Sequence, residues 1–199
     1  MSRKGALDAP LSSFMSVARR PPLRVVTEPP VPDGLPASLH LDELFRRYSA
    51  YVAYIGVRIL GQDDDVDDLV QDVFVEAARG VSRLADPGAV KGWLGTVTVR
   101  VASRRLKVRR LRRFLRLEDA PVTDVRWAGA DPEQCATIGR LYRILDLVPA
   151  RHRIAWLLRV VEGESLEETA RLCGCSLATV KRWIAEVQRT IDREARDER

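Results

Sequence analysis

The sequence predicts an all-α fold of two small helical domains, joined by a flexible linker and preceded by a disordered leader. Apolar residues recur at helical spacing within residues 41–116 and again within 134–199, and no segment alternates as a half-buried strand does. Residues 117–133 mix Pro, Gly and acidic residues without any period, as a linker does. Residues 1–40 hold most of the eleven prolines, which indicates a disordered leader, either an inert tail or a partner-binding arm.

The composition argues against a membrane-spanning or secreted protein. The 199 residues are 46% hydrophobic, which is enough to bury a sizeable core. No apolar run approaches the roughly 18 residues that a membrane span requires, and the N-terminal segment lacks the apolar stretch of a secretory signal. The three cysteines have too few possible ligands nearby for a structural zinc site. We therefore expect a cytoplasmic protein with reduced thiols and no membrane insertion.

The first domain is expected to begin with two amphipathic helices. From Leu41 one apolar stripe is formed by Leu44, Phe45, Tyr48, Val52, Ile55, Ile59 and Leu60. Gly61 and the aspartates behind it end this helix. The second helix is predicted to bury Val66, Leu69, Val70, Val73, Phe74 and Ala77, with aspartates over its first turn and Gly80 at its end.

A third helix is expected to lead into a strongly basic segment. Trp93, Val97 and Val101 make an apolar line, after which the chain reads RRLKVRRLRRFLR from Arg104 to Arg116. Such a run costs free energy through like-charge repulsion, so it indicates an anionic partner. The anionic partner can be nucleic acid, an acidic membrane surface or an acidic protein, and the charge alone does not distinguish them.

The second domain is predicted to contain a helix-turn-helix. Two apolar stripes, interrupted at Pro149, end at Gly163; they consist of Leu141, Ile144, Leu145 and Val148, then Ile154, Leu157, Leu158 and Val161. Ser165 and Glu168 have capping-box spacing, Gly174 lies in a short turn, and Ser176 caps a final helix. This order is typical of a DNA-binding helix-turn-helix, although a plain helical hairpin has the same local pattern.

The final helix has a core face and an outward face. Val180, Ile184, Val187 and Ile191 are predicted to point inward. The first two turns, which a helix-turn-helix presents to base edges and phosphates, carry the candidate DNA-binding residues Ser176, Thr179, Lys181, Arg182 and Trp183. Cys173 and Cys175 are expected to pack in the turn, with a thiol redox switch as the alternative.

The second helix also presents a polar surface opposite its buried face. This surface consists of Asp68, Gln71, Asp72 and Val75. By composition alone it favours a solvated face over a docking site. Calcium binding by the aspartates is disfavoured because the segment lacks the loop glycine and terminal glutamate of a calcium site. We predict no metal site and no cofactor.

The order of these motifs resembles the extracytoplasmic-function group of the sigma-70 family of bacterial transcription initiation factors. The resemblance rests on DLVQDVF in the acidic helix, on the tryptophan helix that becomes basic, and on LVPARHRIAWLLRVVEGESLEETARLCGCSLATVKRW. It implies a region 2 domain and a region 4 domain that bind core RNA polymerase, through the clamp helices of its largest subunit and its flap, and two promoter elements. Under this resemblance Asp68, Gln71, Asp72 and Val75 become the polymerase-binding surface. An anti-sigma factor is a further candidate partner.

The resemblance also assigns a role to the basic helix. Residues implied to contact the promoter near −10 are Trp93, Arg100, Arg104, Arg105, Lys107, Arg109 and Arg110. Arg100 and Arg104 replace the Asn and Asp usual in that family, so a contact with the phosphate backbone is expected from them rather than capture of a base. The outward residues of the final helix are implied to read the element near −35.

These motifs predict an alternative sigma factor that is not an enzyme. The two histidines, His40 and His152, lack plausible catalytic partners, and no glycine-rich phosphate loop is present. Two alternatives remain open at this point. One is a helix-turn-helix regulator that acts without polymerase, and the other is a sigma-like decoy that binds core polymerase or an anti-sigma protein but opens no promoter.

Overall fold

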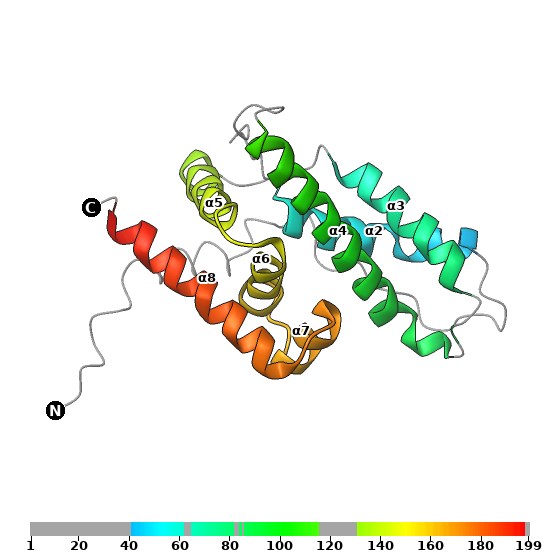
Figure 1. The fold of residues 1–199 in the computed structure, drawn as a ribbon. Helices are drawn as coiled ribbons and strands as arrows, with labels where there is room; N and C mark the ends of the chain where they lie inside the picture. Colours follow the sequence, from blue (N-terminus) through cyan, green and yellow to red (C-terminus); the bar gives the residue numbers. More distant parts are fainter. Residues whose placement is uncertain (1–40, 62–64, 82–83, 85, 116–130, 198–199) are drawn as a thin grey trace.

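A computed structural model describes residues 41–61, 65–81, 84, 86–115 and 131–197. The predicted leader and nearly all of the predicted linker lie outside these residues. The described part consists of helices and connecting turns and contains no strand, which confirms the all-α prediction. Figure 1 shows α4 running between the α2–α3 pair on one side and the C-terminal helices on the other.

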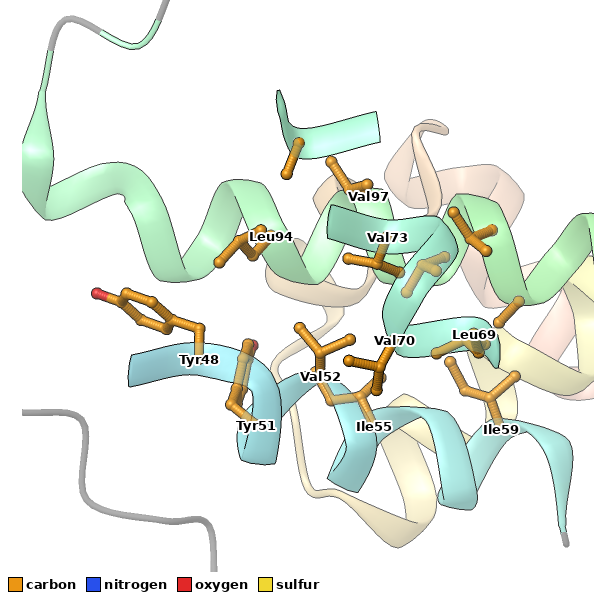
Figure 2. Close-up of a cluster of buried hydrophobic side chains, with 14 of the residues drawn as sticks. Tyr48, Tyr51, Val52, Ile55, Ile59, Leu69, Val70, Val73, Leu94 and Val97 are labelled. Atoms are coloured by element: carbon orange, nitrogen blue, oxygen red, sulfur yellow. The ribbon is translucent and has the colours of Figure 1, made fainter. Parts of the chain in front are cut away.

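The first domain consists of three helices, α2 (Leu41–Leu60), α3 (Val66–Gly80) and α4 (Val90–Phe114). A short 3-10 turn, η2 (Pro87–Ala89), directly precedes α4. All six side chains predicted for the core face of α3 are buried, and they belong to one cluster with side chains of α2 and α4. Figure 2 shows three of them, Leu69, Val70 and Val73, within this cluster. Phe45 departs from the prediction because it is 45% exposed and packs edge-on against Phe74 at the margin of the core.

The second domain comprises α5 (Pro132–Leu145), α6 (Ala150–Trp156), a π-helical turn η3 (Leu157–Val161), α7 (Leu166–Cys173) and α8 (Leu177–Asp197). Helix α5 starts two residues before the predicted boundary, because Asp131 and Gln134 form a capping box around its first turn.

Helices α7 and α8 form the predicted helix-turn-helix. Gly174 has a φ of 61°, the left-handed conformation that glycine adopts without steric cost, and it ends α7. Ser165 caps α7 by accepting a hydrogen bond from the Glu168 N–H. The reciprocal half of the predicted capping box is replaced, because the Glu168 carboxylate pairs with Arg171 instead.

The two domains pack directly against each other, which the sequence patterns did not predict. Ile154, Leu158 and Leu172 of the second domain belong to the same buried cluster as the core of the first domain. Gly95 of α4 permits this approach, since an added Cβ would lie 3.1 Å from Leu172. We call this packed arrangement the closed state.

Polar contacts also join the domains, at the end of α2. The buried guanidinium of Arg153 donates hydrogen bonds to the carbonyl oxygens of Ile59 (3.1 Å) and Leu60 (2.9 Å) and pairs with Asp146. The carbonyl groups in the last turn of a helix have no intrahelical partner, so these hydrogen bonds satisfy groups that would otherwise need water or a cap. The closed state therefore completes the hydrogen bonding of α2 from a different domain.

Tyr142 makes a second contact at the same helix end. Its hydroxyl donates a 2.6 Å hydrogen bond to the carbonyl oxygen of Arg58, and its ring covers Gly61. Gly61 has a φ of 77°, and an added Cβ there would lie 2.3 Å from the Tyr142 ring. The residue that stops α2 thus also makes room for the second domain.

Candidate nucleic-acid interface

The predicted polymerase-binding residues form an exposed strip along α3. Asp68, Gln71 and Asp72 are exposed, and Val75 adds an apolar side chain that is 54% exposed. The α-helical spacing of these positions places them on the side opposite the buried Leu69 and Val73. The structure therefore brings the four residues together on one surface, as the sequence suggested.

Ion pairs connect α3 to the basic helix α4. Asp72 pairs with Arg105 at 2.6 Å, and Asp65 pairs with Arg109, also at 2.6 Å. Arg109 additionally donates a hydrogen bond to the carbonyl oxygen of Leu60. One residue of the predicted polymerase surface is thus directly paired with one residue of the predicted −10 surface.

Glu76 is a site residue that the sequence analysis did not identify. Its carboxylate pairs with Arg100 at 2.6 Å and also with Arg104. Burial raises the pKa of the Glu76 carboxyl, but the hydrogen bonds and charges of the two arginines outweigh this, and the pKa lies below its ordinary value. The acid lies one helical turn beyond Asp72, a spacing that could have indicated a position facing α4.

Two cations of the predicted −10 set, Lys107 and Arg110, have a different environment. Lys107 and Arg110 are exposed, and within the described residues neither side chain has an ion-pair partner. They are the members of the predicted −10 set whose charge is available to a phosphate backbone without breaking an existing pair.

Trp93 lies beside an open cavity at the start of α4. The cavity has a volume of about 540 Å³ and is lined by Glu76, Arg79, Gly80, Leu84, Trp93 and Arg100. Gly80 lets the indole approach closely, because an added Cβ would lie 2.9 Å from the ring. An aromatic face next to guanidinium groups provides stacking and charge, the two features that single-stranded nucleic acid needs from a protein.

The outward face of α8 presents the predicted −35 residues in two groups. Lys181 and Arg182 are exposed, and no ion pair holds either of them within the described part of the chain. Ser176 and Thr179 belong instead to the helix start, where the Thr179 N–H donates a 3.2 Å hydrogen bond to the Ser176 hydroxyl. The two basic side chains are therefore the ones best placed to reach DNA.

Trp183 is only partly exposed and stacks on His152, with ring centroids 5.1 Å apart and an interplanar angle of 24°. His152 Nδ1 also lies 3.3 Å from a carboxylate oxygen of Glu186. Burial lowers the pKa of His152, with Arg182 adding to this effect and Glu186 opposing it. This cluster supports the position of α8 against α6.

The cysteines of the turn are packed rather than activated. Burial raises the pKa of the Cys173 thiol to about 12 and raises that of Cys175 as well. Both thiols are free, and both pack against the cluster formed by Ala155, Ala170 and Val180. Because the thiolate is the reactive form, these environments favour the packing interpretation over the redox switch.

The described residues contain neither a candidate metal site nor a candidate membrane span. No group of three or more His, Cys, Asp or Glu side chains there could hold a metal ion. None of the helices in the described ranges combines the length and apolar character needed to cross a bilayer.

Comparison with known proteins identifies both domains. Residues 44–113 match the family model "Sigma-70 region 2", and residues 138–187 match "Sigma-70, region 4". The chain is 33% identical over 146 residues to the ECF RNA polymerase sigma factor SigE of Mycolicibacterium smegmatis, a match covering 70% of this chain and 55% of that protein. It is 29% identical over 152 residues to SigM of Mycobacterium tuberculosis, covering 76% and 75% of the two chains.

A solved structure shares the fold. The sigma factor RpoE of Bartonella quintana, in complex with the anti-sigma factor NepR, matches with a TM-score of 0.54 and 20% identity, covering 79% of this chain and 97% of that one. The two region matches lie on the two helical domains described above, in the order that the motifs predicted. The chain belongs to the sigma-70 family, in its extracytoplasmic-function group.

Proposed function

We propose that this chain binds core RNA polymerase as an alternative sigma factor and directs it to promoters through one DNA contact in each domain. The observation that carries the proposal is the combination, in one chain, of an exposed acidic strip on α3, a basic α4 beside an aromatic cavity, and a helix-turn-helix with two available cations. A regulator that acts without polymerase has no use for the α3 strip. The proposal places the protein in the cytoplasm, where polymerase acts, and assigns it no enzymatic activity.

The α3 strip is the proposed contact with the polymerase clamp helices. An apolar side chain surrounded by polar ones, as Val75 is, resembles the small apolar centre and polar rim of protein interfaces. Asp68 is exposed and supplies the negative charge that attracts a basic partner surface. Asp72 can contribute as well, but its pairing with Arg105 means that its charge is shared.

The cavity beside Trp93 and the cations Lys107 and Arg110 are the proposed contact with the element near −10. Arg100 and Arg104 are held by Glu76, so we assign them mainly to shaping this surface. Phosphate contacts fix the position of the strand, and the indole supplies a stacking face for an exposed base. Lys181 and Arg182 are the proposed contacts with the element near −35.

The closed state cannot contact both elements at once. Promoter positions near −10 and −35 are separated by roughly 85 Å of duplex at about 3.4 Å per base pair. In the structure, however, α4 packs against α7, which directly precedes α8, the helix that carries the proposed −35 contacts. The second domain must therefore leave α4 before the protein engages a promoter, and the contacts of Arg153 and Tyr142 must break.

The proposal is tested by two assays with purified core polymerase. A native gel shift measures complex formation, and run-off transcription measures whether the complex initiates. Binding together with initiation supports the proposal. Absence of binding would favour the polymerase-independent regulator, and binding without initiation on any fragment of a genomic library would favour the decoy.

A further inference from the structure

A basic cavity lies between α4 and the second domain. Its volume is about 240 Å³, and its polar lining includes Arg100, Ser103, Arg104 and Lys107 from α4 and Arg151 from α6. Four of these side chains are cationic, and no acidic residue among those that the structure describes lines the cavity. Because low-dielectric walls focus a single-sign field, such a cavity concentrates anions.

A second cavity of about 210 Å³ adjoins the first, since Lys107 and Arg151 line both. The described residues that it adds include Arg110, Arg113 and Arg153, and one of them, Asp146, is acidic. That carboxylate is already paired with Arg113 and Arg153. The two cavities therefore form one basic seam along the domain boundary, with cations in excess over its full length.

Several donors in the seam have no acceptor among the residues that the structure describes. Lys107, Arg110 and Arg151 are exposed and unpaired within the residues that the structure describes, whereas Arg100 and Arg104 share the carboxylate of Glu76. The Ser103 hydroxyl is buried, at 9% exposure of the residue, and has no hydrogen-bond partner in the described part. A serine inside a helix commonly bonds to the carbonyl four residues earlier, so an unpartnered buried hydroxyl beside a basic cavity indicates an external acceptor.

The positive charge of the seam opposes the closed state through repulsion between cations of the two domains. Lys107 belongs to the first domain and Arg151 to the second, so closure brings like charges to the same cavity wall. An anion bound between them would replace repulsion with charge-assisted hydrogen bonds from both domains. Apolar contacts between the domains also hold the closed state, and a bound anion would add to them.

We propose that this seam binds a small phosphate chain with several negative charges, and that the bound anion holds the two domains in the closed state. Inorganic triphosphate and the phosphate moiety of a nucleoside triphosphate share this chemistry. The described residues that line the first cavity include no aromatic side chain, so recognition is assigned to the phosphates rather than to a base. The binding step does not depend on the proposed transcription role, which enters only because closure and promoter contact exclude each other.

The test is isothermal titration of the full chain, without polymerase, using inorganic triphosphate and then GTP. We expect one binding site. Lys107→Ala and Arg151→Ala, which remove cations from different domains, should each weaken triphosphate binding at least tenfold. Arg189→Ala is the matched control, since Arg189 is an exposed cation of α8 whose hydrogen bond goes to its own helix, and it should leave the affinity within twofold.

Equal affinity for triphosphate and GTP would support recognition of the phosphate chain alone. Markedly tighter binding of GTP would show that the base contributes and would contradict the assignment of recognition to the phosphates. Wild-type affinity in Arg151→Ala, or equal losses in all three variants, would overturn the site. A single-stranded DNA oligonucleotide forms the third arm. If Arg151→Ala weakens DNA binding as much as triphosphate binding, the seam is part of a DNA channel and the proposal is wrong.

Discussion

The guanidinium of Arg153 donates a hydrogen bond of 2.9 Å to the carbonyl oxygen of Leu60, across the boundary between the two domains. Arg153 is the only arginine among the buried residues of the described chain, and burial lowers its pKa while Asp146 and Tyr142 act to raise it. A buried charge that loses its partners is strongly destabilising. This contact therefore ties the stability of the second domain to its position on the first.

Replacing Arg153 by Met should weaken the closed state. The change keeps much of the side-chain volume but leaves the carbonyl groups of Ile59 and Leu60 without their donor, and breaking a buried pair typically costs about 3–5 kcal/mol. Double electron–electron resonance between spin labels on α3 and α8 should show a longer and broader distance distribution. Arg143→Met, at an exposed position of α5, is the control. A distribution identical to wild type would contradict the assigned role of Arg153.

The His152–Trp183 stack predicts a dependence of stability on pH. The pKa of His152 is lowered in the native state, so the unfolded chain binds a proton more readily than the native chain as the pH falls through about 6.5. The free energy of unfolding should therefore decrease below this pH, by at most about 1.4 kcal/mol per pH unit for one proton.

Urea unfolding of wild type and His152→Gln between pH 7.5 and 5.5 checks this expectation. Subtracting the free energy of unfolding of the variant from that of wild type at each pH cancels the contribution of the carboxyl groups that both proteins share. Wild type should lose more stability than the variant as the pH falls. A constant difference over the range would show that His152 titrates alike in both states.

Periodicity predicted the first domain well because its helices are amphipathic. The six positions expected on the core face of α3 are all buried, and Gly61, Gly80 and Gly174 lie at helix ends as expected. Phe45 was misassigned because it lies at the edge of the stripe, where helical spacing does not distinguish a core position from a margin. Spacing also placed the α3 strip and the outward cations of α8 correctly.

The contacts between segments could not be predicted from local patterns. In the sequence, Arg153 is one basic residue of a short helix, with no sign of a buried position. Only the fold brings it to the end of α2, where it contacts Leu60, 93 residues earlier in the chain. The pairing of Glu76 with Arg100 and Arg104 likewise depends on how α3 and α4 align. The basic run was interpreted as one uniform surface, whereas the structure divides it into cations paired with α3 and cations that face the domain boundary.

Two neighbouring residues of α8 should differ in what they contribute to promoter binding. Arg182→Ala should relax preference at one or two bases of the element near −35, because a bidentate contact with guanine contributes roughly 1–3 kcal/mol of discrimination. Lys181→Ala should instead weaken binding to all sequences about equally and reduce its salt dependence, as loss of a phosphate contact does. Transcription of a promoter library with each variant measures both effects. Unchanged preference in Arg182→Ala would remove this residue from sequence reading.

Charge reversal on the α3 strip should weaken binding to core polymerase strongly. Asp68→Arg is the cleaner variant, because Asp72→Arg would also break the pair with Arg105 and disturb α4. The affinity should fall at least tenfold, which is about 1.4 kcal/mol or more. Asp197→Arg makes the same charge change at an exposed position near the end of α8 and should bind as wild type does. Equal binding by both variants would place the polymerase contact elsewhere.

The most direct test of the account is run-off transcription from a genomic fragment library by core polymerase with this chain added. We expect transcripts whose start sites share two sequence elements, near −10 and −35, that core polymerase alone does not select. Asp68→Arg should abolish these transcripts, and Arg182→Ala should reduce them and relax the upstream element. Transcripts that are the same with and without the chain, although the chain binds core, would contradict its role as a promoter specificity factor.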